Sequence, residues 1–189
     1  MRLPGDTYMT LQEIKRIPLP HYPIFLYSDS GSPFSWLIRK IDKSAGSHLW
    51  LLIGADCIAN QSFTYHLTGV DSMRNYVTKL IWNPFQNPKQ KEAIIKAAVE
   101  RCDLPWYRRL YDFIGLFGEL LEIVGLKCNI KKLDFCSEAV CRMLADVDPA
   151  AKAWLQTNPS PTPREFNQWT KSNNPPWQVY GRYSPDDEE

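Results

Sequence analysis

The spacing of apolar residues along the chain follows two periods, and these periods predict the secondary structure. Short apolar or alternating runs bounded by turn residues indicate β-strands at residues 24–27, 48–54, 62–67 and 76–82. Helical spacing predicts helices at residues 11–17, 34–41, 88–102, 107–126, 136–147 and 163–169. Because the strands follow one another with short connections, the pattern predicts an α+β fold in which an antiparallel sheet packs against helices.

The segment around Cys136 combines a helix start with a chemically useful side chain. From Cys136 onward, apolar residues recur at the spacing of one helical face, and Asp134 is suited to cap the first turn. Cys136 is then expected in the first turn, on the face toward the core. A helix N-terminus favours a thiolate over a thiol. The alternative interpretation is that Cys136 and Cys141 are small apolar residues of the core.

Composition narrows the classes of function. The chain has 189 residues, enough for one well-formed core, and its net charge of +1 argues against nucleic-acid binding by bulk electrostatics. Its five cysteines are odd in number and form no Cys-x-x-Cys pair, which indicates free thiols in a reducing compartment. The ligand spacings of a zinc site are missing, so we expect neither a metal nor a cofactor.

The ends of the chain differ in composition from its middle. We expect an N-terminal arm at residues 1–20, a main domain at 21–148 and a Pro- and Trp-rich segment at 149–189 that wraps on the domain and ends in an acidic tail. The sequence shows neither a secretory signal nor a stretch suited to span a membrane. We therefore expect a cytoplasmic protein, or one carried in a phage particle.

A catalytic thiol needs a partner that moves protons, and the chain has three histidines. His21 lies in a proline-restrained loop, whereas His48 begins a predicted strand and His66 lies on the next predicted strand. Opposed side chains on adjacent antiparallel strands lie about 5 Å apart. His66 could therefore fix the orientation of His48, although both could equally be ordinary sheet residues.

Several of these segments together resemble a known family. Residues 46–54 (GSHLWLLIG), followed much later by residues 134–140 (DFCSEAV), resemble the circularly permuted NlpC-type papain-like cysteine hydrolases, the YiiX/YaeF-like proteins. In that branch the histidine strand precedes the cysteine helix. Residues 111–113 (YDF) and 64–70 (TYHLTGV) resemble two further elements of the family, and the likeness spans about residues 24–147.

The resemblance implies a papain-like fold and a role for each candidate residue. Cys136 corresponds to the nucleophile, His48 to its general acid and base, and His66 to the third residue, with Thr64 left open as an alternative. The amide of Cys136 would contribute to an oxyanion hole.

The implied reaction is hydrolysis of an amide bond, in a peptide or in peptidoglycan-type material, through a thioester acyl-enzyme. One alternative is a lipid-directed acyl hydrolase or acyltransferase, which the Trp content and the apolar 107–126 segment would suit. Another is a non-enzymatic interaction protein that keeps the fold and docks through its C-terminal segment.

Overall fold

In the computed structural model, six strands form one sheet in the order β4-β3-β2-β1-β5-β6, and every neighbouring pair is antiparallel. The structure describes residues 7–31, 35–36, 39–40, 45–61, 65–105 and 136–187. The strands are β1 (Ile24–Asp29), β2 (His48–Gly54), β3 (Cys57–Gln61), β4 (Tyr65–Thr68), β5 (Val77–Trp82) and β6 (Gln178–Tyr183). The predicted α+β class with an antiparallel sheet is confirmed.

Four of these strands were predicted and two were not. The runs at 24–27, 48–54 and 76–82 became β1, β2 and β5, and the described part of the run at 62–67 lies in β4. Strand β3 was missed; it turns back on β2 through a two-residue turn at 55–56. Strand β6 was also missed, because it lies in a segment whose proline content argued for irregular structure.

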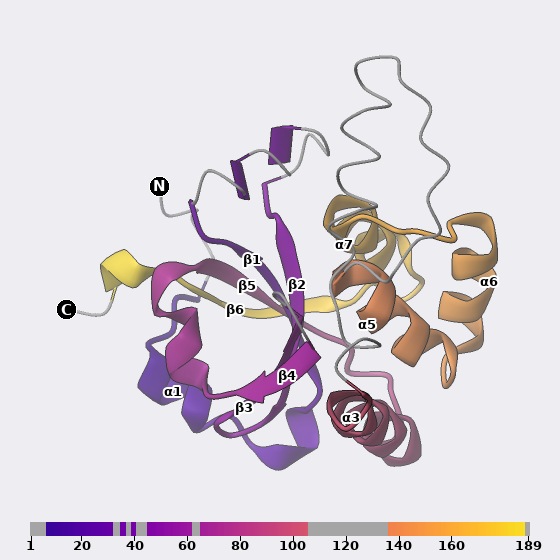
Figure 1. The fold of residues 1–189 in the computed structure, drawn as a ribbon, viewed down its shortest axis with the longest axis horizontal. Coiled ribbons are helices and arrows are strands. Elements are labelled where there is room, and N and C mark those ends of the chain that lie inside the picture. The colour runs from indigo at the N-terminus through magenta and orange to yellow at the C-terminus, as the bar shows by residue number, and fades with distance from the viewer. Residues whose placement is uncertain are drawn as a thin grey trace.

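Helices cover both faces of the sheet (Figure 1). The predicted helices at 11–17, 88–102, 136–147 and 163–169 correspond to α1 (Leu11–Lys15), α3 (Pro88–Cys102), α5 (Cys136–Ala145) and α7 (Pro163–Ser172). An additional helix, α6 (Pro149–Thr157), begins at the proline that Asp148 caps. Of the predicted helix at 34–41, residues 35–36 and 39–40 are helical. The rest of it, the expected helix at 107–126 and the expected cap Asp134 lie outside the described residues.

Side-chain alternation along the strands builds a core on each face of the sheet. In β2, Leu49 and Leu51 point into the core formed with α3, α5 and α7, whereas Trp50 and Leu52 point into the core formed with α1. Figure 1 shows α3, α5, α6 and α7 together on one side of the curved sheet and α1 on the other. Strand β2 is therefore buried on both faces, which explains its continuous apolar run.

The C-terminal segment completes both the core and the sheet. Phe166 of α7 is fully buried, with its ring 5.5 Å from that of Phe25, and Trp169 and Trp177 are in contact at 5.4 Å between ring centroids. Strand β6 then pairs with β5 along its length. We predicted that this segment wraps on the domain; the structure goes further, because the segment supplies two helices and an edge strand.

The N-terminal arm covers the outer edge of β6. Met9 N–H donates to the Arg182 carbonyl at 2.8 Å, and Arg182 N–H donates to the Thr7 carbonyl at 2.9 Å. A Cβ at Gly181 would lie 2.5 Å from the sulfur of Met9, so the glycine lets the Met9 side chain pack directly against β6. Pairing at this position occupies backbone groups that an edge strand otherwise leaves open.

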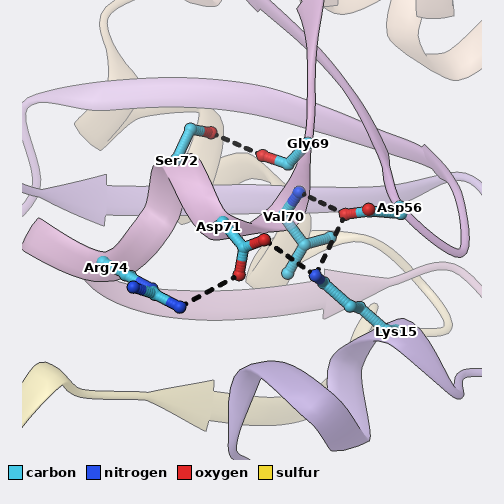
Figure 2. A network of polar contacts seen from close by, with 7 residues as sticks. All are labelled: Lys15, Asp56, Gly69, Val70, Asp71, Ser72 and Arg74. Atoms are coloured by element: carbon cyan, nitrogen blue, oxygen red, sulfur yellow. Dashed lines mark hydrogen bonds and ion pairs between the residues drawn. The ribbon is translucent and has the colours of Figure 1, made fainter.

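A polar network connects α1 to two neighbouring segments of the fold (Figure 2). Lys15 Nζ lies 2.9 Å from Asp71 Oδ2 and 3.6 Å from Asp56 Oδ1, and the same Asp56 oxygen accepts a hydrogen bond from Val70 N–H at 2.8 Å. The network therefore joins α1, the β2–β3 turn and the 3-10 helix η2 (Val70–Asn75). Both carboxylates are more than half exposed, so these ion pairs orient the elements more than they stabilise them.

The position of Phe166 gives a direct test of the C-terminal contribution to the core. Replacing this buried ring in Phe166→Ala should lower the free energy of unfolding by about 3–5 kcal/mol, measured by urea denaturation. The matched control is Phe85→Ala, because Phe85 is 58% exposed and its loss should change stability by about 0.5 kcal/mol or less. Equal effects of the two changes would show that α7 does not belong to the core.

Candidate active site

The start of β2 is fixed by contacts with the neighbouring strand β1. Gly46 N–H donates to the Tyr27 hydroxyl at 2.8 Å, and Ser47 N–H donates to the Ser28 carbonyl at 2.9 Å. A Cβ at Gly46 would lie 2.6 Å from the Tyr27 ring, so the residue must be glycine for the chain to pass. His48 follows as the first residue of β2, directly opposite Ser28.

Cys136 is the first residue of α5, which packs along β2. The apolar face predicted for this helix is buried, and so are Ser137, Glu138 and Cys141, so the helix is covered on more sides than its pattern indicated. Ser137 Oγ donates to the Pro161 carbonyl at 2.6 Å, which places the segment before α7 against the start of α5. Cys136 itself is 1% exposed.

The structure brings Cys136 and His48 together, as the sequence predicted. The thiol of Cys136 and the imidazole of His48 share a hydrogen bond. The other side of the ring is also held, because His48 Nε2 lies 2.8 Å from Asn60 Oδ1. Since an amide oxygen only accepts, Nε2 carries the proton in this contact and Nδ1 is left for the sulfur.

The electrostatics of Cys136 favour its ionised form. Burial raises the pKa of the thiol, but four favourable contacts outweigh burial and the net pKa lies below the ordinary value. These contacts are the charge of His48, its hydrogen bond to the sulfur, and the backbone N–H groups of Leu49 and Ser137. The Ser137 N–H belongs to the first turn of α5, so the helix start contributes as expected.

His48 shifts in the complementary direction. Burial lowers the pKa of the imidazole, but the charge of Cys136, its hydrogen bond and the hydrogen bond to Asn60 raise the pKa to a net value above the ordinary one. Each partner thus stabilises the charged form of the other, which moves the pair toward a thiolate beside an imidazolium.

The predicted contact between His48 and His66 is wrong. It assumed that their strands are neighbours, but β3 lies between β2 and β4. His66 pairs across β3–β4 with Asn60, so Asn60 occupies the position beside the imidazole that we had expected for His66. The alternative third residue, Thr64, lies outside the described residues.

Asn60 was missed because β3 was missed. The signal was present as a short run of small and apolar residues at 57–59, directly after the glycine and turn residues that end β2. Read as the return strand of a hairpin, this run places Asn60 near the level of His48 on the adjacent strand.

The other described cysteines have surroundings that do not activate a thiol. Burial raises the pKa of Cys57, with the charge of Asp56 acting in the same direction. Burial, followed by the negative charge of Cys136, raises the pKa of Cys141 well above the ordinary value. Cys102 donates to the Ala98 carbonyl at 3.3 Å. Cys128 lies outside the described residues.

Within residues 7–31, 35–36, 39–40, 45–61, 65–105 and 136–187, no group of three or more His, Cys, Asp and Glu side chains is arranged to hold a metal ion. The same residues contain no helix with the length and apolar character needed to cross a bilayer.

Comparison with known proteins returned no match to a family model, to a curated protein or to a solved structure. The relation to the permuted NlpC-type hydrolases therefore stays a prediction based on the motifs of the sequence.

The opposed pKa shifts predict how the reactivity of Cys136 depends on pH. Alkylation by iodoacetamide, followed by peptide mass spectrometry, should reach its plateau below the ordinary thiol pKa of 9.0. In His48→Ala the apparent pKa of the alkylation rate should rise to 9.0 or above, because burial then acts on the thiol without the opposing charge of the imidazole. Cys57 and Cys102 are the internal controls, since both are more exposed than Cys136. If they react first at neutral pH, the thiolate assignment is wrong.

The hydrogen bond to Asn60 predicts which neighbour orients the imidazole. Asn60→Ala should slow alkylation of Cys136 at neutral pH by about tenfold to a hundredfold, because the ring loses its fixed orientation and part of its raised pKa. His66→Ala is the matched control on the neighbouring strand and should change the rate by less than about threefold. If His66→Ala slowed alkylation of Cys136 more than Asn60→Ala did, His66 and not Asn60 would be the residue that orients the imidazole.

Proposed function

We propose that this protein is a cysteine hydrolase that cleaves an amide bond through a thioester acyl-enzyme. The observation that supports the proposal is the chain of contacts from Cys136 to His48 to Asn60, in which the thiol has a lowered pKa and the imidazole a raised one. A nucleophile, a proton-transfer group and a residue that orients it are the three parts that thiol catalysis requires, and Cys-His-Asn is the set used by papain-like proteases.

The proposal includes the circularly permuted papain-like arrangement of the NlpC type. Its support is the chain order: His48 begins β2, Asn60 follows on the next strand, and Cys136 begins a helix that comes later and packs on β2. Cys136 and His48, which carry the resemblance in sequence, share a hydrogen bond, whereas Asn60 lies outside the segments that resemble the family.

The proposed reaction begins with attack of the Cys136 thiolate on the substrate carbonyl carbon. The sulfur–carbon bond forms, and the amide C–N bond breaks as His48 transfers its proton to the leaving amine. Neutral His48 then takes a proton from water, and the resulting hydroxide attacks the thioester. The carbonyl carbon gains oxygen, the sulfur leaves as thiolate, and the acid product departs.

Within this proposal the backbone at the start of α5 stabilises the developing oxyanion. The Cys136 N–H is an expected donor, because the first amides of a helix have no acceptor within the helix itself. A donor of this kind contributes only when the carbonyl oxygen becomes charged, so it accelerates the reaction without tightening binding of the substrate.

The bond cleaved is tested by substrate and by variant together. The protein and its Cys136→Ala and Cys141→Ala variants are incubated with acyl-peptides, with muropeptides and with phospholipid vesicles, while amine and fatty-acid release are measured. We expect amine release from a peptide or muropeptide, a loss of at least about a thousandfold in Cys136→Ala, and near-normal rates in Cys141→Ala. Cys141 is a matched control because it is equally buried in the same helix.

Mass spectrometry of the quenched reaction supplies the second readout. An acyl adduct on Cys136 that hydroxylamine removes is expected for a thioester. Fatty-acid release without amine release would instead support the lipid-directed alternative. Slow and equal labelling of the described cysteines, with no substrate turned over, would support a non-enzymatic interaction protein.

A further inference from the structure

A pocket lies at the end of the sheet opposite His48. His48 pairs with Ser28, which lies beside the first residues of β5. The pocket begins at Asn83, directly after the last residue of β5, so the two sites lie at opposite ends of that strand. Its walls come from the start of α3, the start of α6 and the loop after α7. Five of its lining residues are carboxamides: Asn83, Gln86, Gln90, Asn173 and Asn174.

Gln86 distinguishes this pocket from an ordinary surface hollow. The residue is 6% exposed, and its buried Oε1 and Nε2 have no hydrogen-bond partner among the residues that the structure describes. Gln90 in the same wall is satisfied, since it accepts from Asn87 N–H and donates to the Val147 carbonyl. An unpaired buried amide costs free energy, which a ligand that supplies an adjacent donor and acceptor would recover.

The charges around the pocket favour a neutral ligand. The described lining residues include one carboxylate, that of Asp148, and no lysine or arginine. Oδ1 of Asp148 already accepts from the N–H groups of Ala150 and Ala151 at the start of α6. An anion would therefore meet a negative charge with no cation nearby, whereas hydroxyl groups could both donate to and accept from the carboxamides.

Aromatic rings add an apolar surface beside these polar groups. Phe85 is 58% exposed and Trp177 is 8% exposed, and both line the pocket. The exposed Phe85 ring and the lining carboxamides together suit a ligand that has one apolar face and hydroxyl groups along its edge. A pair of neighbouring hydroxyls presents the donor and acceptor that the Gln86 amide lacks.

Size and position favour a sugar over a peptide. The cavity volume is about 230 Å³, below the roughly 300–1,000 Å³ of pockets for drug-sized ligands, so it suits a single ring. Peptides usually bind along a strand edge or in an apolar groove, and this pocket lies beyond the end of a strand and is lined by amides. We propose that this pocket binds one ring of a neutral saccharide, independently of the chemistry at Cys136.

The proposal is tested by titrating the full chain with N-acetylglucosamine, followed by NMR chemical-shift changes. A saturable response is expected, with a Kd in about the millimolar range for so small a ligand. Gln86→Leu should weaken binding by about tenfold, since it removes both polar atoms, and Phe85→Ala should weaken it by at least about threefold. Gln168→Leu is the matched control, because Gln168 is exposed on α7 and does not line this pocket.

Thermal unfolding without sugar separates loss of binding from loss of folding. Gln86→Leu should melt at or above the wild-type temperature, because it removes an unpaired buried amide. If that variant nevertheless unfolds, Phe85→Ala decides the outcome, since its side chain is largely exposed. Absence of saturable binding, or equal affinity in wild type and the decisive variant, would overturn the proposal. So would saturable binding of N-acetyl-alanine amide, used as a peptide probe, with no response to the sugar.

Discussion

The hydrogen bond between the Cys136 thiol and the His48 imidazole is the interaction on which the candidate site depends. Burial opposes the charged form of both groups, and Cys136 is only 1% exposed. The charged forms are favoured because each stabilises the other and because two backbone N–H groups also reach the sulfur. The relative position of α5 and β2 is therefore an electrostatic requirement as much as a packing result.

The rest of the fold fixes the position of α5 relative to β2. Strand β2 lies inside the sheet, with a core on each face, and its first residue is fixed by the passage of Gly46 over the Tyr27 ring. The segment before α7 contacts the start of α5, where the Ser137 hydroxyl donates a hydrogen bond to the Pro161 carbonyl. The C-terminal segment is thus connected to the candidate site through the core.

Much of the fold could be predicted from periodicity alone. Strand β2 and helix α3 coincide with their predicted bounds, because a continuous apolar run and a helix between capping residues are strong local signals. Strands β3 and β6 were missed for different reasons. The first is short and follows a tight turn, and the second lies in a segment whose proline content argued for irregular structure.

The sequence by itself indicated which thiol and which imidazole would meet, because the motifs around His48 and Cys136 resemble those of a known family and place them at a strand start and a helix start. It could not determine the third residue. That choice depended on which strand lies next to β2, and strand order is a property of the whole sheet. With β3 between β2 and β4, Asn60 reaches the imidazole and His66 pairs one strand further out. Local patterns fix the elements, whereas long-range pairing decides which side chains share a site.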